Sequence, residues 1–188
     1  MSRWNHTVRT IAMSALLISV YRAEAQGPAT ETPPSLLSAI DKSVPNATPI
    51  TLADVDMKGC DPVPKSPGLV QADFNGDSRL SYAVLLKAGE TGKVVDWQGT
   101  KLKQTRYVLA LFLDDGMGGF TFKPIHRFED FSPIAAYIDL QRAGSIKSTS
   151  DNRTVVIHNP GVSLVFCEKS EAVYYISGNR VRTVWVGD

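Results

Sequence analysis

A series of short segments rich in β-branched and aromatic residues dominates the chain from residue 69 onward. Residues of these types pack well on the pleated, half-buried surface of a sheet, so each segment is typical of a β-strand. The segments are residues 69–74, 82–88, 106–113, 120–128, 154–158, 162–167, 172–176 and 181–186. Gly, Asn and Pro separate them, and such short connections favour antiparallel neighbours.

Turn residues predict where these strands reverse. Residues 114–119, 159–161 and 177–179 each join two apolar runs and combine Gly with Asp, Asn or Pro, so each is interpreted as a hairpin connection. Residues 131–142 fit neither the helical nor the strand period. That segment is therefore left open, as a short helix or as a loop and a strand.

A short helix is expected before the strands. Over residues 34–42, Leu36, Leu37 and Ile40 recur at helical spacing, and the prolines at 45 and 49 favour an end soon afterwards. Three prolines between residues 62 and 67 then predict an extended segment that cannot pair as a central strand. The expected fold class is α+β: one domain, residues 35–188, dominated by an antiparallel twisted sheet with the helix against it.

The N-terminal residues are typical of a secretory signal peptide. Arg3 and Arg9 precede an apolar run from Ile11 to Val20, and small residues at Ala23 and Ala25 precede Gln26. A transmembrane helix needs roughly 20 apolar residues, which this run does not reach. We therefore expect cleavage after residue 25, a flexible leader over residues 26–34, and a periplasmic or secreted protein with no membrane span after cleavage.

Charge argues against a nucleic-acid partner. The whole chain has a formal net charge of +1, and the predicted signal peptide carries three arginines and one glutamate, so its removal leaves −1. Nucleic-acid-binding proteins usually carry a basic patch or stripe, and the sequence has no run of Lys and Arg. The expected partner is an envelope or extracellular protein or a glycan.

Two cysteines lie in the predicted mature chain, Cys60 and Cys167. An exported chain meets an oxidising environment, where a lone pair of cysteines tends to form a disulfide. A redox role would favour a Cys-x-x-Cys spacing, which is absent. We therefore predict a structural Cys60–Cys167 disulfide.

Oxygen-bearing side chains alternate around a glycine in the stretch that follows the first predicted strand. Asp73, Asn75 and Asp77 lead through Arg79 to Ser81, and an apolar strand begins at Tyr82. Calcium takes six to eight oxygen ligands in proteins, and alternate residues of a tight turn can converge on one point. The same residues can also cap and brace a strand-to-strand turn without any metal.

This stretch resembles the calcium loop of the FG-GAP repeats found in integrin α-subunit propellers and related bacterial repeats. In that family the first, third, fifth and ninth positions supply side-chain oxygens and the seventh a backbone carbonyl. The resemblance implies a calcium site formed by Asp73, Asn75, Asp77, the Arg79 carbonyl and Ser81. The family commonly has Gly at the sixth position and Asp at the ninth, where this chain has Ser78 and Ser81.

The chain holds a single copy of this motif and is too short for a full propeller. It is similar instead to small exported bacterial proteins of unknown function that carry one such loop before a β-rich tail. That similarity implies no known activity.

The sequence contains no set of residues that is typical of a known catalytic site. His126 and His158 lack a metal-binding spacing, and neither a nucleophile elbow nor a phosphate-binding glycine loop is present. Asp114 and Asp115 precede Gly116 and are interpreted first as turn residues. No catalytic residue is assigned, and an enzyme is not expected.

Aromatic residues on the last two strands suggest a binding patch. Tyr174 and Tyr175 are adjacent and must point to opposite faces of a strand, so one can pack inward while the other joins Trp185 at the surface. Ordinary packing of the hairpin on the core is the competing interpretation. The expected function is a non-catalytic binding or structural module with calcium as its possible cofactor. The alternative is an envelope hydrolase, or an inhibitor of one, whose cleft is shaped by a loop over residues 89–100.

Overall fold

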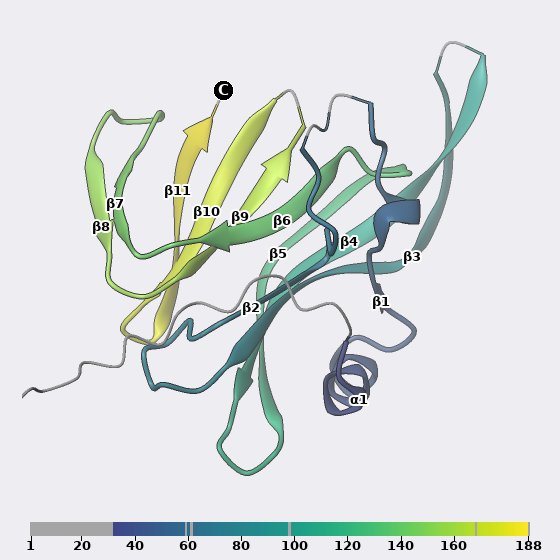
Figure 1. Ribbon diagram of the computed structural model, residues 1–188. Coiled ribbons are helices and arrows are strands. Elements are labelled where there is room, and N and C mark those ends of the chain that lie inside the picture. Colours follow the sequence, from purple (N-terminus) through teal and green to yellow (C-terminus); the bar gives the residue numbers. More distant parts are fainter. Residues whose placement is uncertain (1–31, 59, 61, 98, 168, 188) are drawn as a thin grey trace, which may run out of the picture.

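Two antiparallel sheets face each other across the main core (Figure 1). The computed structural model describes residues 32–187 apart from 59, 61, 98 and 168. The predicted signal peptide and all of the predicted leader before residue 32 lie outside these residues. The fold class is confirmed: the protein is one body of mainly antiparallel sheets with one short N-terminal helix.

The first sheet contains β1 (Thr48–Pro49), β2 (Leu69–Ala72), β3 (Ser81–Trp97), β4 (Thr100–Asp114) and β5 (Phe120–Ser132). Its order is β1-β3-β4-β5, and β2 also pairs with β3. The second sheet contains β6 (Ala136–Gln141), β9 (Gly161–Phe166), β10 (Ser170–Ser177) and β11 (Arg180–Gly187), in the order β11-β10-β9-β6. Every pairing within these two sheets is antiparallel.

Both faces of the first sheet are buried at its centre. Ala83 and Leu85 of β3 point into the core between the sheets, whereas Val84 and Leu86 point to the other face. That face is covered by α1 (Pro34–Ser43), which packs Leu36 and Ile40 onto it. Leu37, which we expected on the same helix face, is 46% exposed. The face of α1 that packs on the sheet is therefore narrower than the spacing of the apolar residues indicated.

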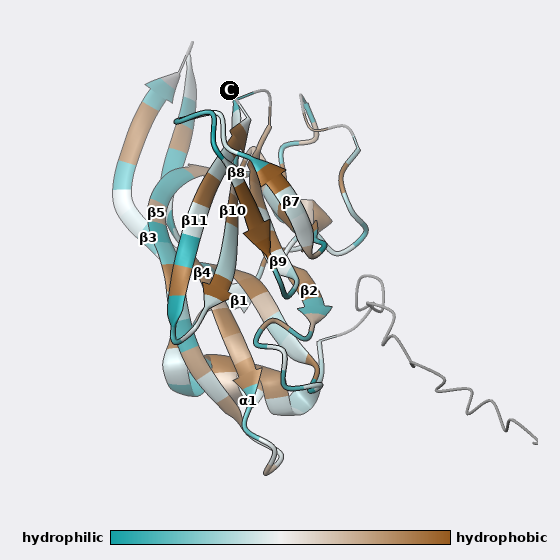
Figure 2. Cartoon of the chain, turned by 90° about the vertical axis from the view of Figure 1, so that its left-hand side faces the viewer, coloured by the Kyte–Doolittle hydropathy of each residue, from teal (hydrophilic) through white to brown (hydrophobic). Residues whose placement is uncertain are grey.

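The outer face of the second sheet is covered by a ribbon of two strands, β7 (Gly144–Lys147) and β8 (Thr154–Ile157). Ile146 and Ile157 of this ribbon pack against Val173 and Val184 of the sheet. Figure 2 views the molecule from the side on which this ribbon lies. The prediction that residues 159–161 form a hairpin connection was therefore wrong: β8 pairs with β7, and β9 pairs with β6 and β10.

The two other hairpin predictions are confirmed, because β4 pairs with β5 and β10 pairs with β11. The segment left open at residues 131–142 contains the end of β5 and the whole of β6. Pro62, Pro64 and Pro67 lie outside any strand, as expected. A 3₁₀ turn at Leu52–Asp54 follows β1. Among the described residues, no helix has the length and apolar character needed to cross a bilayer.

The end of the β3–β4 hairpin, residues 89–103, projects away from the body, and we call it the arm (Figure 1). Its two strands pair from Glu90 opposite Thr105 to Trp97 opposite Thr100. The segment expected as a loop at residues 89–100 is therefore mostly strand. Gly89 and Gly92 mark two register irregularities rather than a chain reversal, which explains the error.

Candidate functional site

The acidic loop between β2 and β3 is organised around Asp73. Its carboxylate accepts hydrogen bonds from the backbone N–H groups of Gly76 (2.7 Å), Asp77 (3.1 Å) and Ser78 (2.8 Å). Gly76 has φ +75°, a conformation in which glycine is the least strained residue. The side chain of Asn159 packs directly against Gly76 and leaves no room for a Cβ there. Asp73 thus closes a tight turn that rests on the β8–β9 connection.

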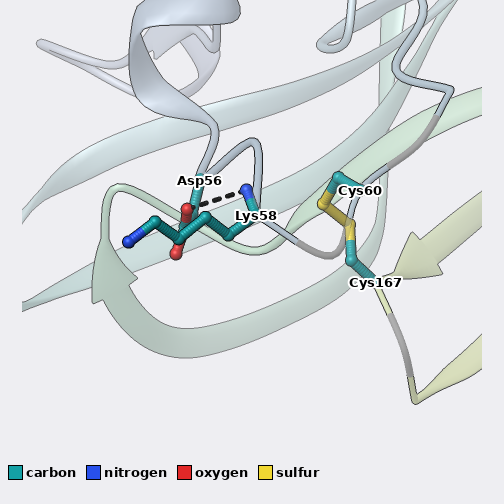
Figure 3. Close-up of a disulfide and its surroundings, with 4 residues drawn as sticks. All are labelled: Asp56, Lys58, Cys60 and Cys167. Carbon is teal, nitrogen blue, oxygen red and sulfur yellow. Dashed lines mark hydrogen bonds between the residues drawn. A yellow bond between two sulfur atoms is a disulfide. The ribbon is translucent and has the colours of Figure 1, made fainter.

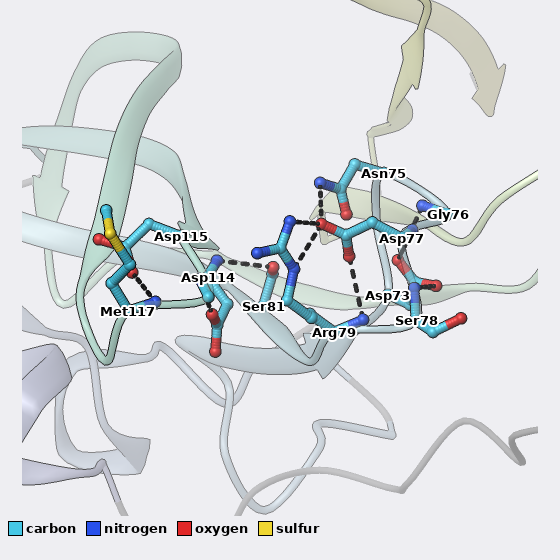
Figure 4. Close-up of polar contacts among 11 residues, drawn as sticks. Asp73, Asn75, Gly76, Asp77, Ser78, Arg79, Ser81, Asp114, Asp115 and Met117 are labelled. Carbon is cyan, nitrogen blue, oxygen red and sulfur yellow. Dashed lines mark hydrogen bonds and ion pairs between the residues drawn. The ribbon is translucent and has the colours of Figure 1, made fainter.

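Asp77 is held by its neighbours within the same loop (Figure 4). Its Oδ2 accepts hydrogen bonds from Arg79 Nε (2.8 Å), Arg79 Nη2 (2.5 Å) and Asn75 Nδ2 (3.0 Å), and its Oδ1 accepts one from the Arg79 backbone N–H (3.0 Å). The Arg79 guanidinium lowers the pKa of the Asp77 carboxyl. Arg79 is therefore the counterion of Asp77 in this structure.

Ser81 points away from the loop and towards the β4–β5 turn. It is fully buried, and its Oγ accepts a hydrogen bond from the backbone N–H of Asp114 at 3.0 Å. The structure thus brings Asp73, Asn75, Asp77 and Arg79 together in one turn. It joins the fifth predicted residue, Ser81, to a second turn that sequence reasoning had treated separately.

The β4–β5 turn is itself acidic. Asp114 Oδ1 accepts a hydrogen bond from Gly116 N (2.6 Å), and Asp115 Oδ1 accepts bonds from Met117 N (2.8 Å) and Gly119 N (3.0 Å). The Met117 and Gly119 bonds lower the pKa of Asp115. Both carboxylates build the turn, as expected for residues beside Gly116.

Arg79 lies between the two acidic turns. Its guanidinium packs on Gly116 so closely that a Cβ there would overlap it. Asp77, and more weakly Asp114 and Asp115, raise the pKa of Arg79 above its ordinary value. Sequence reasoning missed this arrangement, although the antiparallel pairing of β3 with β4 places the start of one beside the end of the other.

The loop fits a calcium ion only in part. The carbonyl oxygen Oδ1 of Asn75 is buried and accepts no hydrogen bond from the described residues, which suits a metal ligand. Asp77, however, already has Arg79 as its cation. Within the described part of the chain, no group of three or more His, Cys, Asp or Glu residues is placed to hold a metal. A calcium ion at this loop would need the Arg79 guanidinium to leave Asp77.

The predicted disulfide is confirmed (Figure 3). Cys60 and Cys167 are bonded across a sequence separation of 107 residues, with their Cα atoms 5.0 Å apart, and both are buried. The bond ties the irregular segment after the 3₁₀ turn to the end of β9. In that segment Asp56 Oδ1 also accepts a hydrogen bond from the Lys58 N–H at 3.1 Å.

The three aromatic residues proposed for binding do not share one surface. Tyr174 is 5% exposed and lies in the core between the sheets, while Tyr175 packs against the β7–β8 ribbon on the opposite face. Trp185 on β11 is 42% exposed. Binding by these residues stays a prediction, and Trp185 is the one whose ring is open to solvent.

The two histidines have different surroundings. His126 stacks between Phe128 and Tyr174, with ring centroids 5.4 Å and 6.0 Å away, and burial lowers the pKa of its imidazole. His158 is exposed at the end of β8. The His126 ring therefore packs as an aromatic side chain between the two sheets.

Comparison with known proteins brings no match: no family model, no curated protein and no solved structure matches this chain. The resemblance to FG-GAP repeats therefore stands on the residues of the acidic loop alone.

Proposed function

We propose that the protein is an exported, non-catalytic binding module whose arm contacts a partner and whose acidic loop responds to calcium. The arm carries the proposal. Val94 and Val95 are adjacent on a strand and so face opposite sides, and they are 57% and 38% exposed. On the projecting hairpin the two valines leave apolar surface open on both faces, away from this chain's own core, and we take this surface as the contact with another molecule.

The carboxylates of the two acidic turns have a structural role. Asp73, Asp77, Asp114 and Asp115 all accept backbone hydrogen bonds within their own turns. Carboxylates used in this way fix loop geometry and are poorly placed to exchange protons with a substrate. The disulfide supports export, since such bonds persist in oxidising compartments. The partner expected is an envelope or extracellular protein or a glycan.

Calcium is the second part of the proposal. Asp73, Asn75, Asp77 and the Arg79 carbonyl would supply its oxygen ligands. Ser81, the fifth residue of the motif, would join them only by giving up its hydrogen bond with the Asp114 N–H. A bound ion would neutralise the clustered carboxylates and stiffen the β2–β3 connection. The Asn75 Oδ1 supports this assignment, because it is buried and accepts no hydrogen bond from the described residues. The Arg79–Asp77 ion pair opposes it, because calcium binding would have to break that pair at a cost in free energy.

Partner capture with matched valine variants tests the binding role. The exported form, residues 26–188, is immobilised and exposed to envelope extracts and to purified envelope glycans. Replacing Val94 and Val95 with threonine keeps shape and strand propensity while removing apolar surface, and it should abolish capture. Val156→Thr is the control, because Val156 is a 54% exposed valine on β8, away from the arm. Equal capture by both variants would contradict the proposal.

Thermal melts in EDTA and in a few millimolar CaCl₂ test the ion. A ligand that binds only the folded state at 100 times its Kd adds about 2.7 kcal/mol, which shifts Tm by several degrees in a domain of this size. Calcium should raise Tm in the parent protein and raise it further in Arg79→Gln, where Asp77 is released. Asp73→Ala should lose the shift. Identical melts with and without calcium for all three proteins would remove the ion from the proposal.

A further inference from the structure

Two arginines, Arg106 and Arg127, lie side by side on the helix-covered face of the first sheet. Val108 of β4 packs towards α1, so Arg106, two residues away on the same strand, points to the same face. Arg127 of β5 is directly opposite Val108 and shares that face. Arg106 and Arg127 are therefore diagonal neighbours, whose Cβ atoms are about 7–8 Å apart in such an arrangement. Two guanidinium groups at that spacing can hold one anion between them.

The two arginines line a hollow of about 520 Å³. The chain leaving α1, through Ser43, Val44 and Pro45, forms one wall, and Ala88 of β3 contributes to another. Val44 and Ala88 also pack against the helix-side core, so these walls are apolar and supported from beneath. Glu129 also lines the hollow, which thus combines two cations and one carboxylate with a small apolar surface.

Neither arginine forms an ion pair within the described part of the chain. Glu129 is directly opposite Arg106 in the ladder, yet its Oε2 lies 3.5 Å from Nζ of Lys93 on the arm. Among the described residues, no carboxylate lies within ion-pair distance of Arg106 or Arg127, and no hydrogen bond engages either guanidinium. Arginine stays protonated at any physiological pH, so the hollow keeps both positive charges.

We propose that this hollow binds a small anion, a carboxylate or a phosphate ester with an apolar group attached. Arg106 and Arg127 donate hydrogen bonds to the anion oxygens, in the paired geometry that guanidinium groups favour. The apolar group lies against Val44, Pro45 and Ala88. The proposal deepens the binding role inferred above by naming a ligand class, and it uses residues outside the arm valines and the acidic loop.

Titration of the exported form with three probes tests it. Inorganic phosphate, phenyl phosphate and benzoate are added at constant ionic strength, and binding is followed by calorimetry or by amide chemical shifts. Saturable binding is expected, with phenyl phosphate tighter than inorganic phosphate because the ring adds apolar contact. Benzoate represents the carboxylates and phenyl phosphate the phosphate esters. Saturable binding of either probe supports the site.

Matched variants locate the site. Arg106→Gln and Arg127→Gln should each weaken binding by tenfold or more, whereas Arg142→Gln, at an exposed arginine after β6, should leave it unchanged. Glu129→Gln should tighten binding because it removes the nearby negative charge. Lys93→Gln should weaken it, since the freed Glu129 can then pair with Arg106.

Equal affinities in the three arginine variants would overturn the proposal, as would the absence of saturation with every probe. The valine variants of the arm should bind the anion normally. A failure of partner capture and a failure of this site are therefore separable.

Discussion

The hydroxyl of Ser81 accepts a hydrogen bond from the backbone N–H of Asp114 at 3.0 Å, and Ser81 has no solvent exposure. This bond joins the first residue of β3 to the last residue of β4. The acidic loop and the β4–β5 turn are thereby fixed to one another, with Arg79 between them. Two turns that are 33 residues apart in sequence behave as one unit.

Ser81→Ala should destabilise the protein by about 1–3 kcal/mol, because the partly buried Asp114 N–H loses its acceptor. Urea unfolding gives the free energy directly. Ser145→Ala, at an exposed serine on β7, is the matched control and should change stability by less than about 0.5 kcal/mol. If the two variants have the same free energy of unfolding, the Ser81–Asp114 hydrogen bond does not contribute to stability.

Loss of the disulfide should be among the most costly changes to stability. In the chain-entropy model a closed loop of this length contributes about 4–5 kcal/mol. The double variant Cys60→Ala/Cys167→Ala should therefore unfold at much lower urea concentration than the oxidised parent. Thiol labelling of the unfolded but unreduced parent should find no reactive cysteine, and two labelled thiols would contradict the bond.

Ser78→Gly should stabilise the loop. Ser78 has φ +65°, where a side chain costs roughly 1–2 kcal/mol of backbone strain that glycine avoids. Part of this gain is offset by the greater freedom of glycine in the unfolded chain, so a net increase of about 0.5–1 kcal/mol is expected. Ser145→Gly on β7 should destabilise instead. A loss of stability in Ser78→Gly would show that the serine side chain contributes more than its strain costs.

The central strands could be predicted from sequence because both of their faces are buried. Residues 82–86 and 107–112 are therefore uninterrupted runs of apolar or aromatic residues. Such runs can be recognised in the sequence without knowing which strands pair with them. The arm could not be predicted in this way. Its residues are mostly exposed and polar, and Gly89 and Gly92 resemble turn residues although the strands continue past them.

In the candidate site, too, the local contacts could be predicted from the sequence and the long-range contacts could not. The contacts of Asp73 and Asp77 are local, within five residues of each, so the motif predicted the turn that they build. The placement of Arg79 against Gly116 depends on the register of β3 with β4, which no local pattern fixes. The β7–β8 ribbon was only half predicted for a similar reason, since β7 has a single buried residue, Ile146.

Adjacent leucines of α1 should respond very differently to truncation. Leu36 is fully buried against the first sheet, so Leu36→Ala should cost about 2–5 kcal/mol through lost packing and the cavity left behind. Leu37 is 46% exposed, and Leu37→Ala should cost well under about 1 kcal/mol. Thermal unfolding followed by circular dichroism compares them. Equal losses would mean that α1 does not pack on the sheet through Leu36.

His126 should make the protein less stable as the pH falls below 6.5. Burial among Phe128 and Tyr174 lowers the pKa of its imidazole below the ordinary value of 6.5. Above pH 6.5 the ring is neutral in both the folded and the unfolded chain, so it contributes no pH dependence. Below 6.5 the unfolded chain takes up the proton first, and stability falls until the pH reaches the folded pKa.

Urea unfolding at pH 7.5 and at pH 5 measures this loss. His126→Phe keeps an aromatic ring between the sheets but cannot bind a proton, so the difference in unfolding free energy between the two pH values should shrink. His158→Gln changes the exposed histidine and should leave that difference as it is in the parent. If His126→Phe retains the full difference, the carboxylates alone govern the acid response. A smaller difference means that protonation of His126 disfavours the folded state, because the charged imidazole is poorly solvated between the two sheets.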